Sequence, residues 1–271
     1  MNDEAALLAA ILANPGEDTP RLVFADWLDE NGHPERAEFI RVQTELARRP
    51  STERKTPAYR ALLVRFRQLV AAHASLWAEA LGVPSTRAIF RRGFIEHVTF
   101  APDEVPGPSN SALVREPLRH VKVEHPLRTG GRPAPGAPVL RRLASWPGHG
   151  RFDILELNGL DIPAEAIGPF LEAPAVARLR VLACPLSPGG VVALTESPHL
   201  AHLEQLALGA VRLSAEQALA LARTRNLPKL RHLDLTVRCD QLADDADPDP
   251  MRSAINALTA RYGNGVYLSR W

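Results

Sequence analysis

Six copies of one short pattern constrain the fold of this chain more than any other feature of its sequence. In each copy, apolar residues occupy the first, fourth and sixth positions. The copies are IEHVTF from Ile95, LRHVKV from Leu118, FDILEL from Phe152, LRVLAC from Leu179, LEQLAL from Leu203 and LRHLDL from Leu230. Because alternate side chains of a strand point to the same face, the fourth and sixth positions lie on one side of a strand. A lone strand cannot bury that side, so the pattern predicts stacked repeats that share a parallel sheet.

Most copies are followed by a segment with helical character. These segments include PAEAIGPFLEA, PGGVVALTES and SAEQALALART, and the stretch SAINALTARYGNGVYLSRW predicts a last helix followed by a final strand. A strand, a turn, a helix and a return together form one coil of a solenoid. The segment 126–150 lies in the longest connection, and its first half is rich in proline and glycine, which predicts a surface loop.

The region before the repeats, residues 1–83, instead predicts a compact helical domain. Apolar residues fall on one face of a first helix, which ends at NPGED. Thr19 and Pro20 predict the start of a second helix, as its N-cap and first residue, and Gly32 predicts its end. Pro34 opens a third helix, and PAYRALLVRFRQLVAAHASLWAEALG forms a fourth.

The stretch AILANPGEDTPRLVFADWLDENGHPERAEFIRVQTEL, from Ala10 to Leu46, resembles the bacterial repeat-companion domain. In that planctomycete-type family, a short helical module precedes leucine-rich or similar repeats. The six copies resemble leucine-rich repeats of the longer, ribonuclease-inhibitor-like class. The asparagine that this class carries three positions after each copy is replaced here by Asp103, Pro126, Leu160, Ser187, Val211 and Arg238.

The two resemblances together imply an α/β solenoid. They imply an N-terminal helical cap domain, residues 1–83, followed by an irregular leucine-rich-repeat-like horseshoe with a parallel sheet, residues 93–271. They also imply a non-enzymatic module attached to recognition repeats, because the repeat-companion family offers no catalytic residues to carry over.

The third and fifth positions of each copy are expected on the concave face of such a horseshoe. They form one column of His97, His120, Ile154, Val181, Gln205 and His232, and another of Thr99, Lys122, Glu156, Ala183, Ala207 and Asp234. From these columns we predict a site that binds a protein partner. Its residues are His97, His120, Lys122, Glu156, Val181, Gln205, His232 and Asp234.

The second position of each copy alternates in charge. It holds Glu96, Arg119, Asp153, Arg180, Glu204 and Arg231. Parallel neighbours about 4.8 Å apart would place each acid beside a base. This row therefore predicts a ladder of ion pairs, which stabilises the stack and argues against a phosphate-binding face.

Two alternatives to protein recognition on the repeats remain, and the first depends on charge. Lysine and arginine (32) nearly balance aspartate and glutamate (31), so no global field favours nucleic acid. The segment 48–92 has a local basic excess, which permits RNA binding, but no aromatic residues interleave with it for base stacking, so solvated arginines are favoured. The second alternative is a regulatory adaptor or substrate in a bacterial signalling or defence system. It rests on the systems in which the resembled family occurs and on no residue of this chain.

The acidic stretch RLVFADWLDENG matches part of the spacing of a calcium-binding loop. Gly32 takes the sixth position of such a loop, but the first position, which must supply an oxygen, is Trp27. Helical geometry instead places Asp26, Asp29 and Glu30 toward solvent, and the alternative for Asp26 is to cap a helix or pair with an arginine of the third helix, such as Arg36 or Arg41. The apolar residues of the stretch are predicted to supply core: Leu22, Phe24 or Ala25, Trp27 and Leu28.

The remaining patterns indicate no catalytic, metal or cofactor site. The acidic loop 244–249 carries aspartates at alternate positions, but it lacks the glycine of a calcium loop, so a solvated loop is favoured over a weak calcium site. His199 and His202 lack the spacing and the glutamate of a zinc hydrolase. No phosphate-binding glycine loop or nucleophile motif occurs. We therefore predict a protein that is not an enzyme and holds no cofactor.

Cellular location is predicted from three features. Two cysteines, Cys184 and Cys239, are too few for a disulfide framework, which favours a reducing compartment, and Cys184 occupies an interior strand position. The first residues lack the basic region of a signal peptide. No apolar run approaches the roughly 20 residues that cross a bilayer. These features predict a soluble cytoplasmic protein without a membrane partner.

Overall fold

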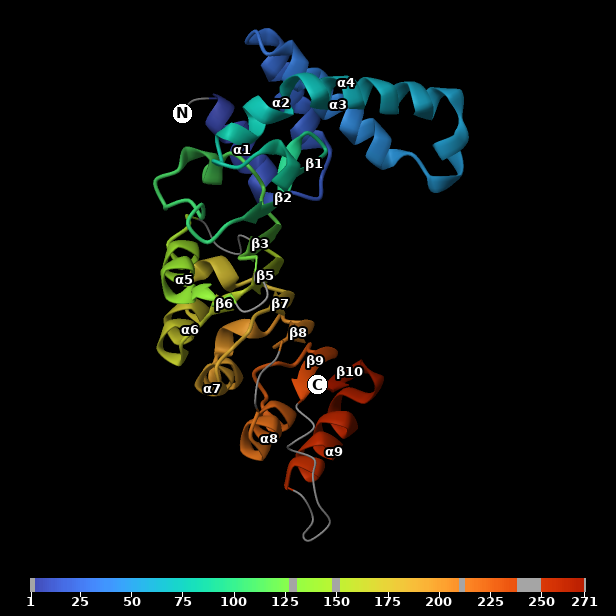
Figure 1. Cartoon of the computed structure of the whole chain (residues 1–271). Helices are drawn as coiled ribbons and strands as arrows, with labels where there is room; N and C mark the ends of the chain where they lie inside the picture. The colour runs from blue at the N-terminus through green and yellow to red at the C-terminus, as the bar shows by residue number, and fades with distance from the viewer. Residues whose placement is uncertain (1–2, 127–130, 148–151, 210–212, 238–249, 271) are drawn as a thin grey trace. The chain divides into compact units, whose positions relative to one another are not determined.

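A computed structural model of the chain describes residues 3–126, 131–147, 152–209, 213–237 and 250–270. The chain has an α/β fold in which most strand pairs are parallel (Figure 1). It divides into two compact units. The first comprises Met1–Thr99 and Ser109–Leu118, and the second comprises Phe100–Pro108 and Arg119–Trp271.

Four helices make up most of the first unit. They are α1 (Asp3–Ala13), α2 (Thr19–Glu30), α3 (Pro34–Arg48) and α4 (Pro57–Glu79), and the short 3₁₀ helices are η1 (Ser51–Lys55), η2 (Ser85–Arg87) and η3 (Ser111–Val114). Gly32 ends α2 as expected, because its φ of 81° lies in the region that favours glycine. The predicted N-cap was wrong by one residue: Asp18 takes that position without a side-chain cap, and Thr19 is already helical.

An antiparallel hairpin completes the first unit. Its strands are β1 (Ala88–Arg91) and β2 (Phe94–Phe100). The side-chain amide of Gln43 on α3 donates to the Phe90 carbonyl at 3.1 Å and accepts from the Gly93 N–H at 2.7 Å. A Cβ on Gly93 would lie 2.7 Å from the Ile40 Cα, so the turn needs a glycine against this helix. The helical unit therefore continues past the predicted boundary at residues 83–93.

A buried arginine joins the hairpin to the second helix. Arg21 is 0% exposed, and its guanidinium donates to Glu96 Oε1 at 2.7 Å, to the Pro15 carbonyl at 2.7 Å and to the Arg91 and Arg92 carbonyls at 3.0 and 3.1 Å. Burial lowers the pKa of Arg21, which its ion pair with Glu96 counteracts. Glu96 was predicted to belong to the charge ladder of the repeats. That prediction was wrong, since Glu96 instead pairs with Arg21 inside the first unit.

The acidic stretch on α2 has one apolar side, which is buried, and one charged side, which is exposed. Phe24, Ala25 and Leu28 are buried, whereas Leu22 and Trp27 are half-buried. Trp27 stacks on Phe24 with ring centroids 5.6 Å apart. Of the two arginines predicted to pair with Asp26, Arg41 does so at 2.7 Å, and it also pairs with Asp29 at 2.5 Å. These acids therefore join α2 to α3.

Six strands pair in parallel in the second unit, in chain order. They are β3 (His120–Glu124), β5 (Ile154–Asn158), β7 (Val181–Ala183), β8 (Gln205–Ala207), β9 (His232–Val237) and β10 (Val266–Arg270). The helices between them are α5 (Gly136–Ala144), α6 (Ala164–Leu171), α7 (Pro188–Glu196), α8 (Ala215–Arg223) and α9 (Pro250–Tyr262), each packed on the next (Figure 1). The C-terminal helix and strand agree with the sequence prediction.

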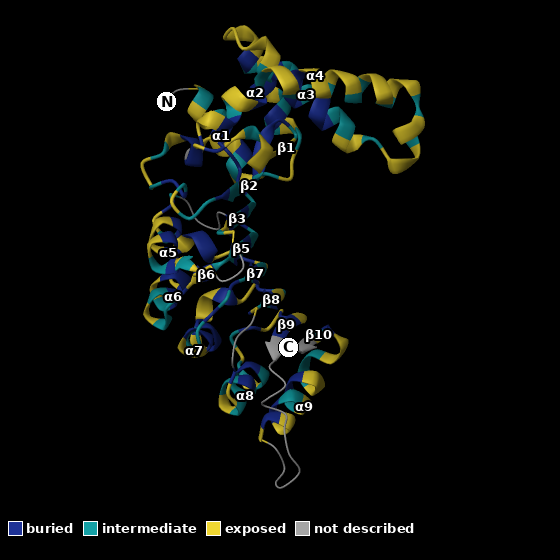
Figure 2. Cartoon of the chain, in the orientation of Figure 1, coloured by how far each residue is buried: buried dark blue, intermediate teal, exposed yellow. Residues whose placement is uncertain are grey.

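The interior of the second unit consists of the fourth and sixth positions of the repeats. In this unit they are at most 2% exposed: Val121, Val123, Leu155, Leu157, Leu182, Cys184, Leu206, Leu208, Leu233 and Leu235. This confirms the predicted inward side of each strand. In Figure 2, helices such as α7 and α8 carry both buried and exposed residues, as expected when one side of a helix covers a sheet.

The connections between successive parallel strands differ from one another. Leu160 and Ser187 stand where leucine-rich repeats carry asparagine. Leu160 forms a short strand, β6 (Leu160–Asp161), which pairs with β4 (Ala134–Pro135), and Ser187 caps α7 by accepting from the Gly190 N–H. In the predicted surface loop, residues 131–133 are exposed before α5 begins. Among the described residues, no helix is long and apolar enough to cross a membrane.

Replacing Arg21 by methionine is expected to lower the free energy of unfolding by about 3 to 5 kcal/mol, because Glu96 would lose its main counter-ion while buried. Urea-induced unfolding followed by tryptophan fluorescence measures this. The double variant Arg21→Met with Glu96→Met should lose less than the sum of the two single variants. Arg54→Met, at an exposed arginine, is the control and should change stability by less than about 0.5 kcal/mol. A loss below about 1 kcal/mol in Arg21→Met would show that the buried pair is not a structural tie.

Candidate functional site

Two rows of outward-facing side chains cross the parallel strands of the second unit. Successive register partners form the first row, His120, Ile154, Val181, Gln205 and His232. The second row is Lys122, Glu156, Ala183, Ala207, Asp234 and Tyr267. Every member is half-buried or exposed. We call these two rows the open face.

Seven of the eight predicted site residues belong to the open face. The eighth, His97, lies half-buried on β2 in the first unit. The sequence columns missed Tyr267, because β10 follows a helix and does not carry the six-position pattern. The signal that would have found it is strand alternation, because Tyr267 stands between two aliphatic residues in the sequence of the predicted final strand.

Polar groups at the β3 and β5 end of the open face satisfy one another. His120 Nε2 lies 2.8 Å from Glu156 Oε1, and Lys122 Nζ lies 2.9 Å from Glu124 Oε1. Ion pairs at a solvent-accessible surface contribute little to stability. Their effect here is that Glu124 offsets the charge of Lys122 and that the Glu156 carboxylate is occupied by its contact with His120, so neither pair offers an unpaired charge to a ligand.

Ion pairs also join neighbouring strands at the second position of the repeats. Arg119 Nε donates to Asp153 at 2.7 Å, and Arg180 donates to both carboxylate oxygens of Glu204 at 3.0 and 2.8 Å. Hydrogen bonding with Glu204 raises the pKa of Arg180, and the same contact lowers the pKa of Glu204. The predicted ladder is therefore present at these two rungs, where arginines that a phosphate would need are already paired.

A hollow of about 330 Å³ lies at the other end of the open face. Its lining residues come from β7, β8, β9 and β10: Val181, Gln205, Leu206, Ala207, His232, Asp234 and Tyr267. Four of the predicted site residues thus meet around one depression. Within the described part of the chain, the side chains of Asp234 and Tyr267 have neither a hydrogen bond nor an ion pair, so both can bind a partner.

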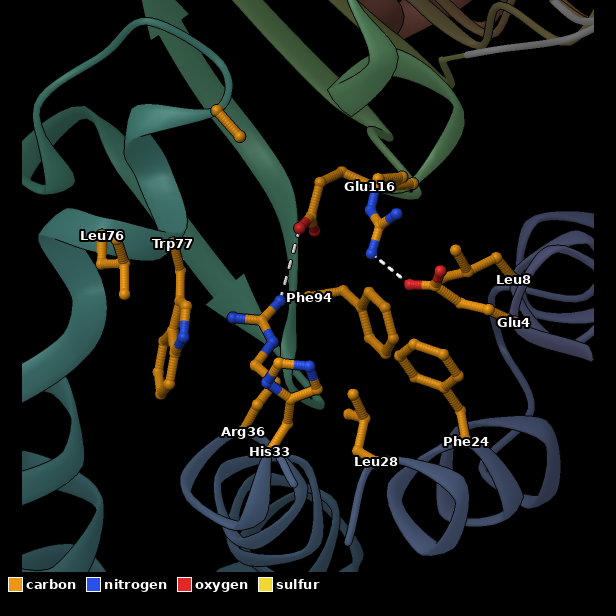
Figure 3. A pocket seen from close by; sticks show the side chains of 12 residues that line it. Glu4, Leu8, Phe24, Leu28, His33, Arg36, Leu76, Trp77, Phe94 and Glu116 are labelled. Atoms are coloured by element: carbon orange, nitrogen blue, oxygen red, sulfur yellow. Dashed lines mark hydrogen bonds and ion pairs between the residues drawn. The ribbon is translucent and has the colours of Figure 1, made fainter. Parts of the chain in front are cut away.

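The first unit contains a second cavity, of about 310 Å³ (Figure 3). Arg36 donates to Glu116 at 3.3 Å and stacks over Trp77, with its guanidinium carbon 4.6 Å from the ring centroid. Glu116 also accepts from the Ile95 N–H at 2.6 Å. Arg36 was one of two arginines predicted to pair with Asp26, and that alternative was wrong. Its contacts hold residues 109–118 against α3, α4 and β2, which is a structural role.

Burial controls ionisation in this second cavity. It raises the pKa of the Glu116 carboxyl, against the opposing effects of Arg36 and of the Ile95 N–H, and it lowers the pKa of Arg36. Each group alone would be expensive to bury in its charged form. The pair, together with the face of Trp77, compensates part of that cost.

The basic segment 48–92 is partly neutralised by carboxylates. Ion pairs join Arg48 to Asp18, Arg49 to Glu45 and Glu53, Arg65 to Glu38, and Arg92 to Asp18 and Glu96. Hydrogen bonds from Arg65 lower the pKa of Glu38, and those bonds raise the pKa of Arg65. Acids outside the segment, Asp18, Glu38, Glu45 and Glu96, thus reduce the excess of positive charge from which the RNA alternative was drawn.

Among the described residues, the other candidates from the sequence form no metal-binding cluster and no reactive thiol site. His199 and His202 are exposed, and His202 Nδ1 lies 3.1 Å from Lys229 Nζ. Cys184 is buried, and burial raises the pKa of its thiol. No cluster of three or more metal-ligating side chains occurs among the residues that the structure describes. The acidic loop 244–249 and Cys239 lie outside those residues.

Comparisons with protein-family models, with curated proteins and with solved structures gave no match.

Cys184 is expected to resist alkylation by iodoacetamide in the folded protein, because its thiol is buried and its pKa is raised. In a Cys239→Ser variant, the native reaction should be about a hundredfold or more slower than the reaction in urea, as measured by mass spectrometry. Equal rates in the two conditions would contradict an interior position for this residue.

The stability contributed by Glu116 is expected to depend on pH with the opposite sign to that of Glu38. The folded-state pKa of Glu116 is raised, so the wild type should lose stability relative to Glu116→Gln as pH rises from below the ordinary carboxyl pKa through the folded-state value. The folded-state pKa of Glu38 is lowered, so the wild type should gain stability relative to Glu38→Gln as pH rises from that lowered value through the ordinary carboxyl pKa. Urea titrations between about pH 3 and pH 8 measure both differences. Two differences of the same sign would overturn this assignment.

Proposed function

We propose that this chain is a protein-recognition module that binds a partner on its open face. In this proposal the first unit is a repeat-companion-like cap, and the second unit is an irregular leucine-rich-repeat-like solenoid. The carrying observation is the hollow of about 330 Å³, where four residues chosen for partner binding from sequence, on the three adjacent strands β7, β8 and β9, meet Tyr267 of β10.

The composition of the open face favours a protein over other ligands. Its centre is small and apolar, formed by Ile154, Val181, Ala183 and Ala207, with polar and aromatic residues around it. Protein interfaces commonly combine an apolar centre with a polar rim. A nucleic acid would require unpaired cations, whereas two arginines next to this face are bound to acids.

The position of the hollow also supports a macromolecular partner. Its lining residues lie on neighbouring strands of one sheet, and four of them, Gln205, His232, Asp234 and Tyr267, are exposed. Small-molecule sites are usually concave enough to bury most of their ligand. A partner protein can instead cover the rows of side chains across several strands, which suits a repeated surface.

Site-specific photo-cross-linking in the native host tests this proposal. A photoreactive residue replaces Gln205, which is exposed on the open face, and in a matched variant it replaces Glu165, which is exposed on α6. We expect a protein adduct from position 205 that position 165 does not give. Val181→Arg, which fills the hollow with a charged side chain, should reduce that adduct about tenfold or more.

The outcomes of this experiment separate the alternatives. Identical adducts from positions 205 and 165 would contradict recognition on the open face. An RNA adduct from position 205 would replace the protein partner by a nucleic acid. Circular dichroism shows whether the Val181→Arg variant keeps its secondary structure. If it does, loss of the adduct is due to loss of binding and not to unfolding.

A further inference from the structure

We infer that the partner inserts a lysine or arginine side chain between Tyr267 and Asp234. This inference rests on the proposed function, because it assumes that a protein occupies the open face. It adds the chemical class of the group that the hollow recognises.

The register of the last two strands places these residues side by side. Tyr267 on β10 and Asp234 on β9 are partners in a parallel pair, in the same row of the open face. Neighbouring strands lie about 4.8 Å apart, so an aromatic ring and a carboxylate stand next to each other. Tyr267 is 58% exposed, an unusual exposure for a large side chain on a sheet, and Asp234 is exposed as well.

The charges around this pair favour a cation. Among the described residues, Asp234 has no ion-pair partner, and the other residues that line the hollow carry no permanent charge. His232 is the titratable neighbour in the adjacent row. A carboxylate attracts a cation, and the face of a tyrosine ring attracts it further. A bound phosphate or carboxylate would instead face Asp234 without a counter-ion.

The floor of the hollow suits the stem of a basic side chain. Val181 and Ala207 provide apolar surface on β7 and β8, beside the polar pair on β9 and β10. Lysine and arginine bury their methylene groups on apolar surface while the charged end stays near a polar group. A purely apolar side chain would fit the floor but would remove water from Asp234 without replacing its hydrogen bonds.

Selection of a displayed library of random peptides on the full chain tests the inference. We expect the enriched peptides to share a lysine or arginine at one position. Their affinity should fall about tenfold for Asp234→Asn and for Tyr267→Leu, while Tyr267→Phe, which keeps the ring, should retain most of it. Glu165→Gln removes one exposed negative charge from α6 and should leave affinity unchanged.

A double-mutant cycle with a single selected peptide connects the two sides of the contact. Replacing the basic residue of the peptide by methionine should weaken binding to the wild type about tenfold and should have little further effect on Asp234→Asn. This coupling distinguishes a direct contact from a general loss of charge.

Failure of the inference is distinguishable from failure of the proposed function. If the enriched peptides lose binding to Val181→Arg but share no basic residue, or bind Asp234→Asn as tightly as the wild type, the cation site is wrong and recognition on the open face stands. If no peptide depends on Val181, both proposals are overturned.

Discussion

Burial of strand side chains against neighbouring strands is the constraint on which the second unit depends. Leu155, Leu182, Leu206 and Leu233 are partners in one row, and each is almost completely buried. One strand could not exclude water from its own leucine, so each strand depends on its neighbours to bury that side chain. Because side chains alternate along a strand, the residues before and after each buried leucine lie on the outer face of the sheet. The open face is thus a consequence of how the interior packs, and its chemistry can vary without cost to that interior.

In the first unit, polar side chains of two helices hold a β-hairpin against the helical layer. Arg21 extends from α2 and donates to the Arg91 and Arg92 carbonyls at the hairpin turn and to the carboxylate of Glu96. From α3, the amide of Gln43 donates to the Phe90 carbonyl and accepts from the Gly93 N–H. Backbone groups in a tight turn need partners when they are buried, and these side chains supply them. Apolar contacts such as that of Phe94 with Phe24 then exclude water from the polar ties.

Periodic features were readable from the sequence, whereas single long-range contacts were not. The interior positions, the two outward rows and the helix end at Gly32 follow from spacing alone, because side-chain alternation and glycine conformation are local properties. Glu96 obeys the repeat pattern but pairs with Arg21, 75 positions earlier, and no local rule indicates that partner. Arg36 likewise contacts Glu116 and Trp77, not the adjacent acids of α2. Tyr267 was missed because its strand belongs to the sheet without repeating the six-position pattern.

The uniform register of the sheet has a consequence for changes in chain length. Arg119 and Asp153 are 34 positions apart and Arg180 and Glu204 are 24 apart, yet both pairs meet in the same way across neighbouring strands. The connections between strands therefore differ in length by ten residues without changing the register. An insertion within a strand would change it, since a shift of one residue would exchange the interior row for the outward row. Surface loops of the second unit are therefore the places where this chain can accept added segments while its open face stays in register.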